Sequence, residues 1–414
     1  MMYQYEIRSV GNLLADAFCS LGLFKLMLMV DPLIKVECNL GHYEILRIKS
    51  RRKPQDFEEE ILRNLKDLVK SEFIRQQLEF EVNTGKTKNG RGPTKPAFEV
   101  LEDDLLRNMS SFSFSAFKPI EKKHKGTKKK ERGGTMKTFY LSVLPVYGSG
   151  LEAYDDETKN VPAMATPEVI VSYMIGLAYY TVCFEENGSR LHLASIKRKS
   201  SKRESRKKAQ SRLHLALIPP LGKRVDERYL LTINRAIALY FTEEGRMYIN
   251  GLKKLPKLTL PLAVLAKLDL ATIELLHEPY PPEILVFNVE RAGKEKKAET
   301  SRLYERYNTT AILRFFLSLG EWMHHVKEYV LSLIKVRGYE KVQGTELSSL
   351  IDSILLKLTL AIINSDADLL NGALFETLRL KDRVEKKLST YVNKIYMLNY
   401  KATSAMVKSL LRIS

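Results

Sequence analysis

The spacing of apolar residues predicts alternating helices and strands at the start of the chain. Residues 12–30 are strongly apolar and stop at Asp31-Pro32, which predicts a buried helix that ends before the proline. Residues 33–48 contain short apolar runs around Asn39-Leu40-Gly41, which predicts a strand, a turn and a strand. Residues 56–81 repeat apolar side chains every three or four positions, which predicts an amphipathic helix with Asp56 as its N-cap.

Mixed signals continue to about residue 300. Phe112, Phe114 and Phe117, followed by residues 138–148, predict strands on either side of a basic loop. Thr166-Pro167-Glu168 is a typical helix start, and Asn187-Gly188 favours a tight turn after a strand at residues 179–184. Further along, the pattern predicts helices at residues 228–241 and 262–277, and a strand at 284–290.

A short repeat suggests a long hairpin. Residues 190–194 and 212–216 have the same sequence, Arg-Leu-His-Leu-Ala, and both copies alternate apolar with polar residues. Pairing of the two copies would make His192 and His214 cross-strand neighbours. Two histidines without a third ligand do not indicate a metal site, and we predict none.

From about residue 303 the pattern is helical. Apolar periodicity predicts one helix over residues 308–335, and another that starts at Thr345 and runs to 364. Asp366 is expected to cap the next helix, which passes into residues 392–398, and a last helix holds Met406, Leu410 and Leu411. The fold class is therefore α+β, with a mixed α/β domain at residues 1–302 and a helical bundle domain at residues 303–414.

Charge is concentrated in two segments of the first domain. The chain has 414 residues and 44% hydrophobic positions, enough for a core in each domain, and a formal net charge of +18. Residues 118–137 carry nine basic residues against two acids, and residues 195–212 carry nine against Glu204 alone, so these segments hold 15 of the 18 excess charges. Both segments contain Gly or Ser in place of most apolar residues, so neither can bury enough apolar surface to fold by itself. We therefore predict two mobile cationic segments that bind a polyanion. Plain solubility, an anionic membrane surface and an acidic protein remain alternatives.

Specific phosphate contacts are assigned to the basic residues of both segments: Lys122, Lys123, Lys128, Lys129, Lys130, Arg132, Lys197, Arg198, Lys199, Lys202, Arg203, Arg206, Lys207 and Lys208. Two smaller clusters lie at residues 47–53 and 85–96. In the second, Lys86 and Lys88 add charge, and Asn89 and Arg91 are candidates for hydrogen bonds to base edges. An ordinary flexible linker explains residues 85–96 equally well.

Catalytic and targeting signals are absent from the sequence. It contains no HExxH, GxSxG or Walker motif, so we expect neither an enzyme nor a cofactor. The alternatives are a metal-dependent nuclease with dispersed carboxylates and a scaffold with incidental basic loops. The longest charge-free run, residues 169–184, is shorter than the roughly 20 residues of a membrane span, and no signal peptide is recognised. With only Cys19, Cys38 and Cys183, a reducing cytoplasmic location is expected.

The chain resembles a known family in its layout. A Lys/Glu-rich, low-cysteine protein with a mixed N-terminal part, long basic excursions and a C-terminal bundle is similar to the large subunit of archaeal type I-A CRISPR surveillance complexes (Cascade). The likeness includes the apolar residues 169–184 and Leu369-Leu370-Asn371 with the residues that follow to Arg379. It implies a non-catalytic subunit that binds guide RNA, double-stranded target DNA and its displaced strand, and other Cascade subunits. It also implies recognition of the protospacer-adjacent motif and recruitment of a helicase-nuclease.

Overall fold

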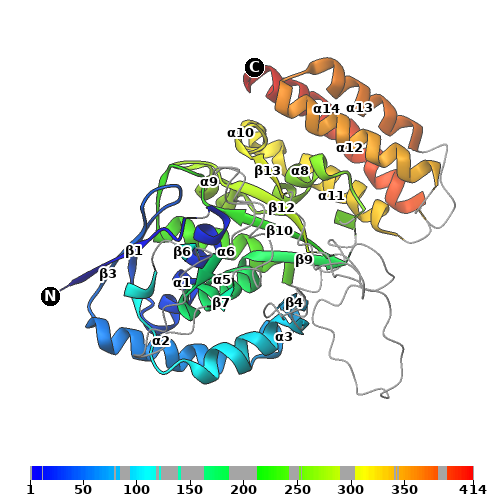
Figure 1. The fold of residues 1–414 in the computed structure, drawn as a ribbon. Coiled ribbons are helices and arrows are strands. Elements are labelled where there is room, and N and C mark those ends of the chain that lie inside the picture. The colour runs from blue at the N-terminus through cyan, green and yellow to red at the C-terminus, as the bar shows by residue number, and fades with distance from the viewer. Residues whose placement is uncertain are drawn as a thin grey trace, which may run out of the picture. The chain divides into compact units, whose positions relative to one another are not determined.

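The chain forms an α+β fold of two compact units, which confirms the predicted fold class (Figure 1). The N-terminal unit comprises residues 1–234 and 285–305, and the C-terminal unit comprises residues 235–284 and 306–414. This computed structural model describes residues 2–11, 13–78, 81–83, 94–117, 121–122, 139–140, 163–185, 212–241, 251–252, 254–289, 304–339, 342, 345–380 and 389–413.

The first sheet of the N-terminal unit has the strand order β1-β3-β2-β11 and is antiparallel throughout. Helix α1 (Leu13–Val30) joins β1 to β2, and β3 lies between these two strands. The predicted helix and the strand, turn and strand are confirmed. The strands are β1 (Tyr3–Arg8), β2 (Lys35–Asn39), β3 (Glu44–Ser50) and β11 (Arg224–Asp226).

One face of this sheet is buried and the other is open. Ile7, Val36, Ile48 and Val225 are buried, whereas their neighbours along each strand are polar and at least partly accessible. Successive side chains of a strand point to opposite faces, so the alternation leaves a polar outer face. This face is the starting point for the candidate site.

Helices α1 and α5 (Pro167–Tyr180) form the core beneath the sheet and pack closely on each other. The predicted start of α5 is confirmed, because the Thr166 hydroxyl accepts a hydrogen bond from the backbone N–H of Val169 at 3.4 Å. The ring of Phe18 meets that of Tyr173 edge-on, with 5.3 Å between centroids. Both helices are buried on nearly every side, which is why their sequences are apolar throughout.

The predicted helix at residues 56–81 is two helices, α2 (Pro54–Val69) and α3 (Glu72–Gln77). Ser71 caps the second helix, since its hydroxyl accepts a hydrogen bond from the N–H of Ile74. The assignment of Asp56 as N-cap was wrong. Proline occupies the first helical position at Pro54, so the extended residue before it, Lys53, is the N-cap and Asp56 lies in the first turn.

The second sheet has the order β13-β12-β10-β9 and corrects the predicted hairpin. The pairing of β10 with β9 places His214 opposite Cys183, and β12 occupies the other edge of β10. The predicted pairing of residues 212–216 with residues 190–194, and with it that of His214 with His192, is therefore wrong, because both neighbours of β10 are other strands. Residues 190–194 themselves lie outside the described residues. The strands are β9 (Thr181–Glu185), β10 (Arg212–Ile218), β12 (Glu283–Val289) and β13 (Tyr304–Asn308).

Shorter elements complete the N-terminal unit. The strand predicted around Phe114 is instead a 3₁₀ turn capped by Ser113, and its phenylalanine packs 5.5 Å from the Tyr5 ring and 5.8 Å from the Phe57 ring. Helix α6 (Glu227–Ala238), whose residues from Arg235 on belong to the C-terminal unit, agrees with the prediction. The others are β4 (Glu81–Asn83), β5 (Thr94–Pro96), α4 (Ala97–Glu99), η1 (Val100–Leu105), η2 (Leu106–Asn108), η3 (Phe114–Ala116), β6 (Glu121–Lys122), β7 (Phe139–Tyr140) and β8 (Ala163–Ala165).

The described part of the C-terminal unit is mainly helical, with strand residues at 283–284 of β12 and 306–308 of β13, and one predicted helix start and one predicted cap are confirmed there. Thr345 caps α12 through the N–H of Ser348, and Asp366 caps α13 through the N–H groups of Asp368 and Leu369. The elements are η8 (Leu239–Phe241), η9 (Lys257–Thr259), α8 (Leu260–Ala266), α9 (Leu270–His277), α10 (Thr310–Ser318), η10 (Gly320–Trp322), α11 (Met323–Gly338), α12 (Glu346–Asn364), α13 (Ala367–Arg379) and α14 (Ser389–Ile413).

Three helix boundaries in this unit differ from prediction. Residues 262–277 form two helices because the Asp269 carboxylate caps α9, accepting from the N–H of Thr272 at 2.7 Å. The predicted helix at 308–335 breaks at Gly320, whose φ of 56° is left-handed. The final helix is longer than predicted, because residues 392–398 and Met406 belong to α14 together.

The two units also divide the chain differently from the predicted domains 1–302 and 303–414. Residues 235–284 group with the C-terminal helices. The hydroxyl of Tyr240 donates to the carbonyl of Val264 at 2.7 Å, and Lys254 donates to the carbonyl of Gly338 at 3.0 Å. Helix α8 packs on α11, and α9 packs on α10. These contacts join segments far apart in sequence, which periodicity alone does not reveal.

Candidate nucleic-acid interface

The predicted contact residues are almost all outside the described part of the chain. Lys122 lies in β6, where it pairs with Ala163 of β8. The other seventeen lie outside the described residues: Lys86, Lys88, Asn89, Arg91, Lys123, Lys128, Lys129, Lys130, Arg132, Lys197, Arg198, Lys199, Lys202, Arg203, Arg206, Lys207 and Lys208.

The structure does describe where each basic segment leaves and rejoins the fold. Glu185 at the end of β9 pairs with Arg212 at the start of β10, so the chain between them begins and ends at one point of the second sheet. Asn83 pairs with Thr94 in the same way, across the β4–β5 ladder. All these strands belong to the N-terminal unit.

The third basic segment is also anchored at both ends, through a shared strand. Lys122 pairs with Ala163 and Phe139 pairs with Ala165, so β6 and β7 flank β8. Each of the three basic segments is therefore an excursion from paired strands. This arrangement fixes the base of each excursion on a folded body, whatever the excursion binds.

A described basic cluster lies at the end of β3, where Lys49 is on the open face of the first sheet and Arg51 and Lys53 follow the strand. Lys49, Arg51 and Lys53 are exposed, and no described acid forms an ion pair with them. Lys49 has Gln4 of β1 as one cross-strand neighbour and Lys35 of β2 as the other. The three side chains, Lys49, Arg51 and Lys53, are called the sheet-end cluster below.

Acidic partners compensate the other cations of this region. Lys35 binds Glu227 at 2.5 Å, and Arg52 binds Glu60. The carbonyl of Arg52 also accepts a hydrogen bond from the Tyr5 hydroxyl at 2.7 Å. Burial is the main cause that raises the pKa of Tyr5 to about 12, with the charge of Glu58 adding to it, so this donor remains protonated at neutral pH. Lys49, Arg51 and Lys53 thus keep their positive charge without a described acidic partner.

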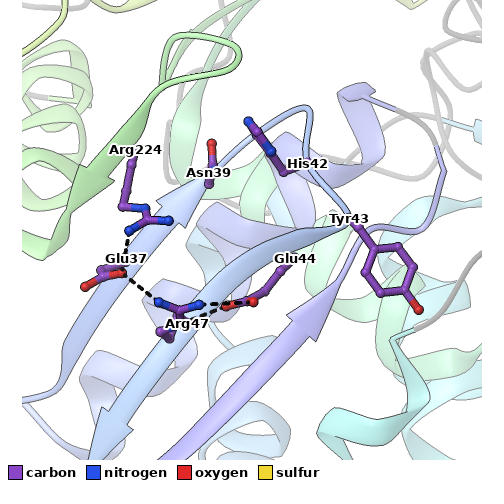
Figure 2. A pocket seen from close by; sticks show the side chains of 7 residues that line it. All are labelled: Glu37, Asn39, His42, Tyr43, Glu44, Arg47 and Arg224. Carbon is purple, nitrogen blue, oxygen red and sulfur yellow. Dashed lines mark hydrogen bonds and ion pairs between the residues drawn. The ribbon is translucent and has the colours of Figure 1, made fainter.

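A pocket of about 330 Å³ lies at the other end of the same face (Figure 2). Glu37 of β2 lies between two guanidinium groups, 3.7 Å from Arg47 and 3.8 Å from Arg224. Glu44 binds Arg47 at 2.9 Å, and its hydrogen bond and charge raise the pKa of Arg47. The lining residues are Glu37, Asn39, His42, Tyr43, Glu44, Arg47 and Arg224.

An exposed aromatic ring stands at the pocket. Tyr43 is 62% exposed, and the guanidinium of Arg8 lies over its ring, 5.4 Å from the centroid. The turn that carries Tyr43 is fixed by its own carbonyl, which accepts from the N–H of Ser9 at 2.7 Å. It is also fixed by the carbonyl of Leu40, which accepts from the N–H of Gly222 at 2.7 Å.

These groups have the chemistry that recognises an unstacked nucleobase. Glu37 and Glu44 offer acceptors, Asn39 offers both a donor and an acceptor, and Tyr43 offers a flat exposed face. Apart from Arg47, which belongs to the basic cluster at 47–53, the sequence interpretation missed this set. The available signal was the alternation of polar residues on the strands at 35–39 and 44–48, which predicts an outward polar face.

The described residues contain no group of three or more His, Cys, Asp or Glu that could hold a metal ion. Within the same ranges, none of the helices has the length and apolar character that crossing a membrane requires. No protein-family model matches the chain, and no curated protein matches it.

Proposed function

We propose that this protein is a nucleic-acid-binding, non-catalytic large subunit of a type I-A Cascade, an RNA-guided antiviral complex. The observation that carries nucleic-acid binding is the distribution of charge. Fifteen of the 18 excess positive charges lie in residues 118–137 and 195–212, and the strands at their bases are paired in the N-terminal unit. Phosphate binding by such cations releases condensed counterions, which favours association with DNA or RNA.

The open face of the first sheet extends the proposed interface. The sheet-end cluster contributes three cations without described acidic partners, and the Tyr43 pocket contributes a stacking surface beside polar groups. A single strand fits this combination, since its bases stack on aromatic rings while its phosphates follow cations. We therefore propose that the sheet holds a short single-stranded stretch and the basic excursions hold backbone on either side.

The Cascade assignment rests on the resemblance in layout. Under it the partners are guide RNA, double-stranded target DNA, the displaced strand, the other Cascade subunits and a helicase-nuclease. Base pairing with the guide reads the target, while the protein reads the short adjacent motif and the backbone. The work takes place in the cytoplasm, where the guide and the invading DNA meet.

The salt dependence of binding tests this function. The affinity of the purified chain for a duplex, a single-stranded DNA and a single-stranded RNA is measured across a salt series. The logarithm of affinity should fall with a slope of about −0.9 per phosphate on duplex DNA and about −0.7 on a single strand. Replacing the eight cations from Lys197 to Lys208 by Ser should reduce that slope by several units. Absence of binding at low salt, alone and within the native assembly, would overturn the proposal.

A matched pair of variants tests the sheet. Serine at Lys49, Arg51 and Lys53 should reduce the slope for single strands by about two. Serine at Arg63, Lys66 and Lys70 removes the same charge from α2 and its C-cap in the same unit and should leave the slope unchanged. Equal effects of the two variants would show that net charge alone matters and would remove the sheet from the interface.

Two further measurements test the assignment to an RNA-guided, non-catalytic subunit. Protein purified from its native cells should carry a small RNA of uniform length, and its absence would count against Cascade. Labelled DNA and RNA should stay intact with Mg²⁺ or Mn²⁺. Cleavage that is lost on changing one carboxylate would instead establish the metal-dependent nuclease.

A further inference from the structure

The hairpin of α13 and α14 carries a stripe of large exposed apolar side chains. The two helices pack against each other, as Figure 1 shows, and Asn399 donates to the carbonyl of Leu374 at 3.4 Å. Leu374 and Asn399 are buried at this contact, while the next residue of each helix, Phe375 and Tyr400, is 66% and 83% exposed. The stripe consists of Phe375, Leu378, Tyr396, Met397 and Tyr400.

Helical geometry places these side chains on one surface. Phe375 and Leu378 are three residues apart on α13, and Tyr396 and Tyr400 are four apart on α14, so each pair shares a helix face. On each helix, the residue after the buried contact is rotated about the helix axis away from the partner helix. Because the two helices run antiparallel, Phe375 and Tyr400 are rotated toward the same side of the hairpin. Phe375, Leu378, Tyr396 and Tyr400 therefore line the outer groove between the two helices. Met397 lies three residues before Tyr400, on the outer side of α14. Apolar patches of this kind on a soluble domain mark interaction sites.

The charges around the stripe indicate the sign of the charge that a binding partner should carry. Helix α14 has four cations and no acid: Lys394, Lys401, Lys408 and Arg412. Glu328 binds Lys394 at 2.8 Å, whereas Lys401 and Lys408 are exposed and have no ion pair with a described acid. On α13, Glu376 is engaged by Lys357 at 2.5 Å. The exposed Asp368 and Arg379 of α13 offset each other in charge, so the cations of α14 leave a net positive charge around the stripe.

We propose that this stripe is the docking site for an acidic amphipathic helix of a partner protein. Apolar side chains at helical spacing would fill the groove, and Asp or Glu on their flanks would face Lys401 and Lys408. A second copy of this chain would bring α14 cations against α14 cations, which disfavours a self-paired stripe. A nucleic-acid strand fits the stripe less well, because bases stack on aromatic rings and Leu378 and Met397 are not aromatic. The docking site goes beyond the proposed function and does not depend on nucleic-acid binding.

A synthetic helix tests this site on the full chain. The probe is an amphipathic peptide of about 20 residues with Leu on one face and Glu on its flanks; the comparison peptide has Lys for Glu. The Glu peptide should bind and should protect the amides of α13 and α14 from hydrogen exchange. Alanine at both Phe375 and Tyr400 should weaken binding at least about tenfold. Alanine at Leu275 of α9, which is 51% exposed, should change nothing.

Charge reversal supplies a second variant that leaves the stripe intact. Lys401→Glu with Lys408→Glu should weaken the Glu peptide and strengthen the Lys peptide. Binding of neither peptide, or equal binding of both to the unaltered chain, would overturn the proposal. A dimer in sedimentation that Phe375→Ala and Tyr400→Ala dissolve would assign the stripe to a second copy. Protection of α13 and α14 by a single-stranded oligonucleotide instead of the peptide would assign it to nucleic acid.

Discussion

Gly22 of α1 and Gly176 of α5 meet where the two core helices cross. A Cβ atom built on Gly22 would lie 1.8 Å from the carbonyl oxygen of Ser172, and one on Gly176 would lie 1.9 Å from that of Phe18. Both obstacles are backbone atoms, which a side-chain rotation cannot move. The two glycines therefore set the distance between α1 and α5, and with it the support beneath the first sheet.

Alanine at either glycine should destabilise the N-terminal unit strongly. The helices would have to separate along a buried contact, and overpacking of a core generally costs about 1–3 kcal/mol or more. Because the obstacle is backbone, we expect at least the upper end of that range for Gly22→Ala and Gly176→Ala. Urea unfolding followed by circular dichroism measures the change in the free energy of unfolding.

Gly372 of α13 provides the matched control. A Cβ there would meet only the flexible side chain of Lys357, with 3.7 Å to its Cδ. Alanine is favoured over glycine inside a helix by about 0.5–1 kcal/mol, so Gly372→Ala should stabilise the C-terminal unit slightly. Destabilisation by Gly372→Ala as large as that by Gly22→Ala would show that the close approach is not the cause.

Burial of Asp16 predicts a specific pH dependence. Its carboxylate is 3% exposed and accepts hydrogen bonds from the Ser9 hydroxyl at 2.6 Å and the Val10 N–H at 2.8 Å. Desolvation outweighs both hydrogen bonds and raises the pKa of Asp16 from 3.8 to about 6. The folded state therefore binds a proton at a higher pH than the unfolded state does. The contribution of Asp16 to stability then rises as the pH falls from about 6 toward 4.

Comparison with Asp16→Asn isolates this contribution, because the remaining carboxyl groups are common to both proteins. Between pH 7 and pH 4.5 the unaltered protein should gain about 2 kcal/mol relative to Asp16→Asn. Chemical denaturation at the two pH values gives the difference. A relative loss on acidification would mean that Asp16 is held ionised in the folded protein.

The ion pair of Arg337 and Asp352 predicts an energetic coupling inside the C-terminal unit. The guanidinium donates at 2.7 and 2.9 Å to the two carboxylate oxygens, and also at 3.0 Å to the carbonyl of Lys254. The Arg337 side chain is only 11% exposed. Arg337→Ala should cost about 3 kcal/mol, since it leaves a part-buried carboxylate unpaired, and adding Asp352→Ala should cost little more.

An exposed pair checks that this cost comes from burial. Lys70 and Asp67 lie 3.0 Å apart on α2 and its C-cap, with side chains 67% and 72% exposed. Solvent screens such pairs, so Lys70→Ala should leave the free energy of unfolding unchanged within error. Additive losses for Arg337→Ala and Asp352→Ala would show that the two residues act separately.

Local signals in the sequence predicted much of the secondary structure. Thr166 and Asp366 cap helices where expected, and the helix expected from Thr345 begins there. A cap joins a side-chain oxygen to a backbone N–H two or three residues later, so it depends on local sequence alone. The partner strand of β10, by contrast, could not be predicted from local signals, because more than one distant segment could pair with it. The identical sequences at 190–194 and 212–216 suggested one partner, and Cys183 lies opposite His214 instead.

The pocket illustrates what such signals cannot supply. Glu37 and Arg47 are neighbours across the β2–β3 ladder, and Arg224 joins them only because β11 adds to the edge of β2. No periodicity links residue 224 to residue 37. The charge of the basic segments, by contrast, could be predicted directly from the sequence. Strands at 179–184 and 212–216 were predicted too, but their pairing with each other was seen only in the fold.

The position of Glu37 between two arginines gives a prediction that charge arithmetic alone would not. Glu37→Gln leaves Arg47 bound to Glu44 and releases Arg224 from its described acidic partner. If nucleic acid lies on this face, affinity should rise, and the salt slope should steepen by about one phosphate, roughly 0.7 to 0.9. Glu59→Gln makes the same change in net charge on α2 and should have no effect.

Combining Glu37→Gln with Arg224→Ser should return the slope to that of the unaltered protein, because the released cation is then removed. Binding titrations over a salt series, with the same single-stranded probe for all four proteins, measure these slopes. Weaker binding by Glu37→Gln would mean that the carboxylate accepts a hydrogen bond from the nucleic acid. A steeper slope for Glu59→Gln as well would attribute the effect to net charge and place the phosphates away from the pocket.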